Sequence, residues 1–158
     1  MSFNQLDQLY RRVIMDHYKN PRNKGSFEDE TLTINMNNPT CGDRIQLQMK
    51  VEDGVIKEAR FSGDGCSISM SSASMMTEAV KGCSVEQALH MATLFSDMMQ
   101  GKDVDPDEFT LEDIEALQGV SKFPARIKCA TLAWKALEKA INEGNEKAEC
   151  GHSHCEEK

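Results

Sequence analysis

The alternation of hydrophobic and polar residues along the chain predicts a helix at its start, followed by strands. Over residues 3–19 apolar side chains recur every three or four positions, which indicates an amphipathic helix. Apolar and polar residues alternate over 32–36 and again over 45–51, as in strands with one buried face, and 55–61 forms a third such run. The Asp53-Gly54 pair between the last two runs accepts the backbone angles of a tight hairpin turn.

The second half of the chain has helical periodicity. A helix is expected over residues 68–80, and another after Ser84, which together with Gln87 forms a capping signal. Residues 110–117 can form a short helix. Pro124 opens the last helix, because its missing amide donor costs least in a first turn, and Gly144 can end that helix.

These elements predict an α+β fold, in which several helices pack on a small three-stranded antiparallel sheet. The length of 158 residues favours a single domain. We assign the domain to residues 1–143. Residues 144–158 read as a disordered acidic tail with a Cys- and His-containing tract over 150–155.

Composition narrows the function classes. The net charge of -8 argues against nonspecific nucleic-acid binding, which requires a basic face. No apolar run approaches the roughly 20 residues that span a bilayer, so no membrane association is expected. The N-terminus carries no apolar signal segment. Six cysteines in such a chain point to metal or thiol chemistry in a reducing compartment, and we expect a cytoplasmic protein.

Candidate chemistry is most evident in the loop that joins the first two predicted strands. Pro39 and Gly42 interrupt the strand pattern and leave Cys41 at a tip. In an extended segment the side chains of Cys41 and Asp43 project from the same face. A thiolate beside a carboxylate suits zinc or ferrous iron. An exposed cysteine with no ligating role is the alternative.

Three further cysteines remain open to more than one interpretation. Cys66 lies near a predicted helix N-terminus, where the helix dipole stabilises a thiolate, although a buried structural cysteine fits equally well. Cys129 falls between buried positions of the last helix and is more simply a core thiol. Cys83 reads as a surface thiol.

His17 lies near the apolar stripe of the first predicted helix, so a structural role is preferred to metal ligation.

Several segments together resemble the IscU/NifU-like family of iron–sulfur cluster assembly proteins, and within it the SufU branch. The resemblance covers the chain from about Leu6 to Ala140 and rests on the segments LYRRVIMDHYKNPRNKG, MNNPTCGDRI, GCSISMSSASMMT and IEALQGVSKFPARIKCATLAWKALEKA. It implies the same α+β fold, with one zinc ion per chain at the edge of the sheet. The implied metal ligands are Cys41, Asp43, Cys66 and Cys129.

The resemblance also implies an activity. Lys128 stands where the scaffold branch of the family typically has a histidine, and residues 102–118 resemble the insertion of the SufU branch. Both features favour a zinc-dependent sulfurtransferase, in which Cys41 accepts persulfide sulfur from a pyridoxal-phosphate-dependent cysteine desulfurase. The desulfurase would displace Cys41 from zinc with a replacement ligand such as a histidine, and the sulfur would pass on to the cluster-building machinery. Arg126, about one turn from Cys129, would pair with Asp43 when the ligands rearrange.

Two alternatives are kept. The protein could be a scaffold that assembles a [2Fe–2S] cluster on the same four residues, a role against which Lys128 argues. It could also be a non-catalytic module in which zinc only completes a small core.

Overall fold

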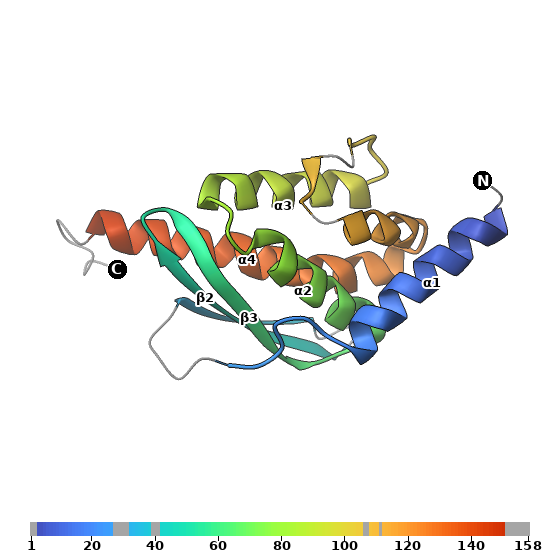
Figure 1. The fold of residues 1–158 in the computed structure, drawn as a ribbon, viewed down its shortest axis with the longest axis horizontal. Helices are drawn as coiled ribbons and strands as arrows, with labels where there is room; N and C mark the ends of the chain where they lie inside the picture. The colour runs from blue at the N-terminus through green and yellow to red at the C-terminus, as the bar shows by residue number, and fades with distance from the viewer. Residues whose placement is uncertain (1–2, 27–31, 39–41, 106–107, 111, 151–158) are drawn as a thin grey trace.

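The computed structural model describes residues 3–26, 32–38, 42–105, 108–110 and 112–150. The sheet has three strands, and Figure 1 shows helices packed against it. Helix α4 (Pro124–Cys150) packs against the first two strands, and α2 (Ser67–Val80) against the third. Two further helices, α1 (Phe3–Lys19) and α3 (Val85–Met99), pack on α2 and α4 respectively. The predicted α+β architecture is confirmed.

The sheet is antiparallel and follows chain order, with strands β1 (Leu32–Asn38), β2 (Asp43–Glu52) and β3 (Val55–Asp64). The predicted alternation holds from residue 43 to residue 49 of β2, where every second side chain is buried, among them Ile45 and Leu47. It ends at Val51, where the register with β3 shifts. Asp53 and Gly54 both adopt positive φ, at 54° and 76°, and form the tight turn between β2 and β3. The alternation therefore places one face of the sheet against the helices.

The helices differ from the sequence prediction in two places. The segment predicted as a short helix over 110–117 is a 3-10 helix, η2, over Glu112–Lys122. Helix α4 does not end near Gly144 but continues to Cys150, because Gly144 lies inside it. The helix thus crosses the predicted boundary between residues 143 and 144, and residues 151–158 lie outside the described residues. The division into a domain and a tail stays a prediction.

A hydrogen-bonded contact fixes α2 against α4. The Ser72 hydroxyl donates to the carbonyl of Ala130 at 2.6 Å and accepts from Trp134 Nε1 at 3.1 Å. The Trp134 ring in turn stacks on Phe95 of α3, with centroids 4.8 Å apart. All these groups are buried, so three helices are held at one point of the core.

His17 joins three elements at another point. Its Nδ1 lies 2.8 Å from Ser74 Oγ of α2, and its Nε2 lies 2.8 Å from Asp113 Oδ2 of η2. Because the backbone N–H of Arg22 already donates to Ser74 Oγ, the Ser74 hydroxyl proton is available to Nδ1, and Nε2–H donates to the carboxylate. His17 is only 1% exposed, which agrees with the predicted structural role.

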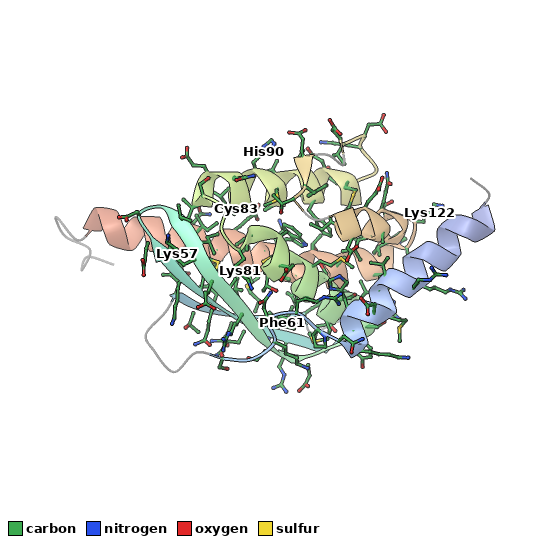
Figure 2. The ribbon with its side chains drawn as sticks, viewed as in Figure 1. Lys57, Phe61, Lys81, Cys83, His90 and Lys122 are labelled. Atoms are coloured by element: carbon green, nitrogen blue, oxygen red, sulfur yellow. The ribbon has the colours of Figure 1, made fainter. Side chains whose placement is uncertain are left out.

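Cys83 is not the surface thiol that its sequence position suggested. It is 8% exposed, as part of the hydrophobic core, and its Sγ lies 3.3 Å from the carbonyl of Ala79. Burial raises the pKa of the Cys83 thiol, because the thiolate would lose its hydration there. Figure 2 places it between α2 and α3, where the backbone turns from one helix to the next.

Among the described residues, no helix is both long enough and apolar enough to cross a membrane.

Candidate metal centre

Asp43 is the first residue of β2 and points into the protein. Its carboxylate is completely buried, because the strand alternation turns residue 43 toward the helices. Oδ1 accepts a hydrogen bond of 2.9 Å from the backbone N–H of Cys66. Oδ2 is also buried but has no hydrogen-bond partner among the described residues. A buried carboxylate oxygen without a donor is costly, and a bound cation would remove that cost.

Cys66 caps the N-terminus of α2. Its backbone is extended, with φ -71° and ψ 169°, and its Sγ accepts from the backbone N–H of Ser69 at 3.5 Å. The chain reaches this position through Gly63, near the end of β3, and Gly65, directly after the strand; a Cβ at either residue would lie within 3 Å of neighbouring atoms. The structure confirms the predicted position of Cys66 at a helix N-terminus.

Cys129 lies in the second turn of α4 and is completely buried. The next residue, Ala130, carries the carbonyl that Ser72 binds. The contact between α2 and α4 therefore also determines where Cys129 lies relative to Cys66. The simpler interpretation of Cys129 as a core thiol agrees with its burial. It does not account for the side chains of Asp43 and Cys66 beside the Cys129 sulfur.

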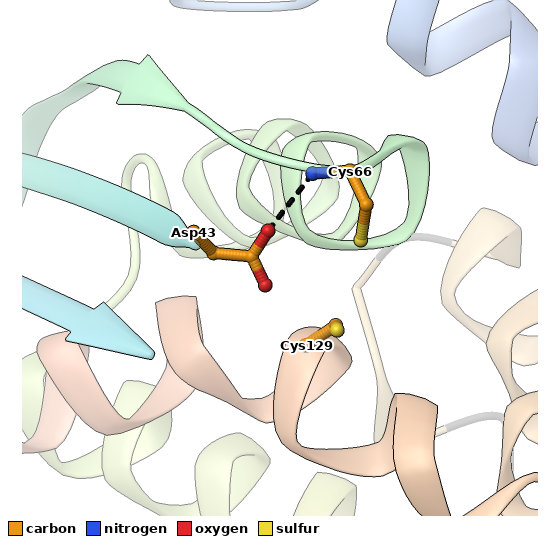
Figure 3. A group of neighbouring side chains, drawn as sticks. All are labelled: Asp43, Cys66 and Cys129. Carbon is orange, nitrogen blue, oxygen red and sulfur yellow. Dashed lines mark hydrogen bonds between the residues drawn. The ribbon is translucent and has the colours of Figure 1, made fainter. Parts of the chain in front are cut away.

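The three side chains converge. One ligand atom from each of Asp43, Cys66 and Cys129 lies within 4.8 Å of the other two. Figure 3 shows the Asp43 oxygen that Cys66 does not bind directed toward the space between the two sulfur atoms. Two thiolates and one carboxylate are a donor set that zinc accepts, and three ligands this close can share one ion. The residues present therefore fit the metal that the resemblance implied.

The fourth predicted ligand, Cys41, lies outside the described residues. The residues on either side of its loop are described. Gly42 donates its backbone N–H to the carbonyl of Asn38 at 2.8 Å, and Gly42 has a positive φ of 74°. This bond joins the last residue of β1 to the residue directly before Asp43. Ligation by Cys41 stays a prediction.

Arg126 and Lys128 lie in the first two turns of α4, with exposed side chains. The backbone N–H of Arg126 donates to the carbonyl of Phe123 at 2.8 Å, so this start of the helix is well defined. The predicted pairing of Arg126 with Asp43 stays a prediction.

Sequence reasoning did not identify two residues beside the centre. Asn38 pairs directly with Asp43 across β1 and β2, is 7% exposed, and has an Nδ2 without a hydrogen-bond partner among the described residues. Ser69 is buried, and its Oγ lies 3.8 Å from Cys66 Sγ. Alternation along β1 was a signal for Asn38, because residues 34, 36 and 38 share the inward face of the strand. Ser69, three positions after the helix cap, could have been found from capping geometry.

Comparisons with known proteins agree with this site. Residues 9–151 match the family model described as the NifU-like N terminal domain. A Bacillus subtilis protein named zinc-dependent sulfurtransferase SufU is 67% identical over 142 residues, which cover 89% of this chain and 95% of that protein. A Streptococcus pyogenes protein named iron-sulfur cluster assembly scaffold protein IscU is 48% identical over 141 residues, 89% of this chain and 87% of that protein.

The fold matches solved structures as well. The crystal structure of FiSufU, from the SUF system of Fervidobacterium islandicum AW-1, superposes with a TM-score of 0.79 at 33% identity. The alignment covers 85% of this chain and 97% of that one.

Proposed function

Because the chain belongs to the NifU-like N-terminal domain family, we propose that it is a zinc-dependent sulfurtransferase of iron–sulfur cluster assembly. The observation that carries the proposal is the convergence of Asp43, Cys66 and Cys129, with a buried carboxylate oxygen left for a cation. The relative named as a zinc-dependent sulfurtransferase, which is 67% identical to this chain over 142 residues, supports the activity.

Asp43, Cys66 and Cys129, with Cys41 as the fourth, would hold one zinc ion per chain. Bound zinc keeps its coordinating thiols deprotonated and compensates their charge. Asp43 is oriented for ligation before any metal arrives, because the amide of Cys66 holds one of its two oxygens. Ligands fixed in this way lose little conformational freedom on binding.

Cys41 is the proposed sulfur acceptor. Its thiolate attacks the outer sulfur of a persulfide on the cysteine of a pyridoxal-phosphate-dependent desulfurase. A bond forms between Cys41 Sγ and that sulfur while the bond within the donor persulfide breaks, and the donor cysteine leaves as a thiolate. Cys41 then carries the persulfide and passes the sulfur to the cluster-building machinery. Cys66 and Cys129, on helices, serve to hold the metal.

Arg126 has a supporting role in this proposal. Transfer at Cys41 changes the negative charge around Asp43, and a guanidinium can compensate such charge with paired hydrogen bonds. Arg126 precedes Cys129 by three residues on α4, within one turn of the centre. Its pairing with Asp43 would keep the carboxylate charge balanced during transfer.

A cluster scaffold is the second candidate, because the Streptococcus pyogenes relative with that name is 48% identical. A scaffold would use the same side chains to hold a [2Fe–2S] cluster. After removal of zinc and addition of iron and sulfide, a scaffold would hold a stable, coloured cluster. A sulfurtransferase would form no stable cluster under the same conditions.

The test is the turnover of a cysteine desulfurase with cysteine as substrate, in the presence of the zinc-loaded protein. We expect strong stimulation by the wild type and none by a Cys41→Ala variant that still contains zinc. Equal stimulation by both proteins, or stimulation by neither, would contradict the transfer role. In that case cluster formation with iron and sulfide tests the scaffold.

A further inference from the structure

The Ser69 hydroxyl lies beside two of the candidate metal ligands. Ser69 is completely buried in the first turn of α2, three residues after the helix cap Cys66. Its Oγ lies 3.8 Å from Cys66 Sγ. A Cβ on Gly65 would lie within 3 Å of both Ser69 Oγ and Asp43 Oδ1, so the hydroxyl and the carboxylate approach the same glycine. The fold therefore places a buried hydroxyl directly behind the centre.

Residue 69 contacts the Cys66 sulfur through both its backbone and its side chain. The backbone N–H of Ser69 donates to Cys66 Sγ at 3.5 Å. As a thiol, Cys66 donates its S–H to Ser69 Oγ at 3.8 Å. The serine hydroxyl then donates to the carbonyl of Cys66, at 3.2 Å. The hydroxyl thus accepts from the sulfur and donates to the backbone of the same residue.

Metal binding by Cys66 would reverse the direction of the bond between sulfur and hydroxyl. A ligating cysteine is a thiolate, which has no proton to donate and can only accept. A serine hydroxyl rotates to suit its neighbours. The Cys66 carbonyl does not depend on that hydroxyl, because the backbone N–H of Met70 donates to the same carbonyl at 3.0 Å. The Ser69 hydroxyl can therefore turn to the sulfur without leaving a buried acceptor unsatisfied.

We propose that the Ser69 hydroxyl donates to the Cys66 thiolate in the metal-loaded protein and is a positioning residue for this ligand, an inference that rests on the proposed metal centre. The thiolate then receives two donors from residue 69, the backbone N–H and the hydroxyl. Hydrogen bonds to a charged acceptor are stronger than those between neutral groups. Contacts of this kind orient a ligand and raise the affinity for its metal.

The test compares three variants of the full chain. Ser69→Ala removes the hydroxyl, and Ser69→Thr keeps it. Ser71→Ala is the matched control, because Ser71 is equally buried on the same helix and its hydroxyl bonds only the carbonyls of Ser67 and Ile68. Chelator competition measures zinc affinity. Cobalt(II) then replaces zinc, because the sulfur-to-cobalt charge-transfer band reports the electron density on the ligating sulfur atoms.

We expect Ser69→Ala to bind zinc about tenfold more weakly than the wild type. Its cobalt band should move to longer wavelength, because a thiolate that has lost a donor is richer in electrons. Ser69→Thr and Ser71→Ala should keep the affinity and the band of the wild type. A purely structural role for Ser69 would weaken binding without moving the band.

An unmoved band in Ser69→Ala would overturn the inference, and so would an equal shift in Ser71→Ala, which would trace the effect to the helix. If Ser69→Ala binds no cobalt, Ser69→Thr decides. Wild-type affinity and band in Ser69→Thr would support the role of the hydroxyl, and their loss would overturn it.

The wild-type protein separates this inference from the proposal on which it rests. If the wild type binds cobalt without a sulfur charge-transfer band, or binds no cobalt, the proposed metal centre itself fails. If the wild type shows the band and Ser69→Ala shows it at the same wavelength, only the role of Ser69 is wrong.

Discussion

Asp43 Oδ1 accepts a 2.9 Å hydrogen bond from the backbone N–H of Cys66, so one metal-ligand candidate is held in place by the backbone of another. The bond joins the first residue of β2 to the cap of α2, which are 23 residues apart in the chain. The bond also determines which carboxylate oxygen can bind a metal. Oδ1 accepts the Cys66 N–H, whereas Oδ2 has no hydrogen-bond partner among the described residues. The geometry of the centre therefore depends on how closely these two segments approach.

Gly65 permits this approach, and we predict that Gly65→Ala weakens zinc binding about 10–100-fold, as loss of a ligand's supporting contact typically does. A Cβ at residue 65 would lie 2.7 Å from Asp43 Oδ1 and 2.4 Å from Ser69 Oγ, so the carboxylate would have to move. Chelator competition measures the affinity. Gly54→Ala is the control, since a Cβ there meets no atom within 4 Å and only the positive φ is strained. Unchanged zinc affinity in Gly65→Ala would contradict the prediction.

Ser72 should contribute more to stability than its buried neighbour on the same helix. Ser72→Ala removes the bond to the Ala130 carbonyl and leaves Trp134 Nε1–H without its acceptor, at a cost of about 1–3 kcal/mol. Ser71→Ala removes only hydrogen bonds to the carbonyls of Ser67 and Ile68 within α2 and should be nearly neutral. Urea unfolding of the metal-free variants checks the difference. Equal free energies of unfolding would show that the contact between α2 and α4 contributes nothing.

His17 links α1, α2 and η2, and we predict that His17→Phe lowers the free energy of unfolding by about 1–3 kcal/mol. Phenylalanine keeps a ring in the buried space but forms neither of the two 2.8 Å hydrogen bonds. Asp113→Asn should cost less than about 1 kcal/mol, because the amide oxygen still accepts from Nε2–H and residue 113 is partly exposed. Urea unfolding should rank the two variants in this order, and the reverse order would refute the prediction.

Cys83 should make stability fall at alkaline pH. Burial raises the pKa of its thiol in the folded protein above the ordinary value of 9.0. At a pH between the ordinary pKa and the raised pKa, the thiol is deprotonated in the unfolded chain but still protonated in the folded protein. The resulting stabilisation is complete below about pH 9 and is lost as the pH rises through the folded-state pKa. Between pH 7 and pH 10 the wild type should therefore lose more stability than Cys83→Ala, as followed by urea unfolding of the metal-free proteins. The same loss in both proteins would contradict this prediction.

The sequence predicted the elements better than their contacts. Alternation identified all three strands and the Asp53-Gly54 turn, because burial on one face imposes a period of two. Helical periodicity did not reveal that α4 continues through Gly144, since a glycine permits a helix end without requiring one. The burial of Cys83 was missed because it depends on tertiary packing: Cys83 is 8% exposed, and its carbonyl accepts from the backbone N–H of Ile56 on β3, distant in the chain.

In the candidate site, too, local features could be predicted from the sequence, whereas contacts between distant segments could not. Cys66 at a helix N-terminus could be predicted from local signals, and the structure confirms that position. The convergence of Asp43, Cys66 and Cys129 came only from the family resemblance, since their spacing in the chain carries no metal-binding pattern. Alternation along β1 could have indicated that Asn38 faces inward, but its pairing with Asp43 depends on the register between β1 and β2, which the sequence pattern does not determine.

The central claim is that sulfur is received on Cys41 while the other cysteines of the centre hold the metal. The most direct measurement is a single turnover of persulfide-loaded desulfurase with the zinc-loaded wild-type protein, followed by peptide mapping of the added sulfur. We predict one extra sulfur atom on the peptide that contains Cys41, and none on those that contain Cys66, Cys83 or Cys129. An adduct on any of those three peptides instead, or no adduct at all, would contradict the account.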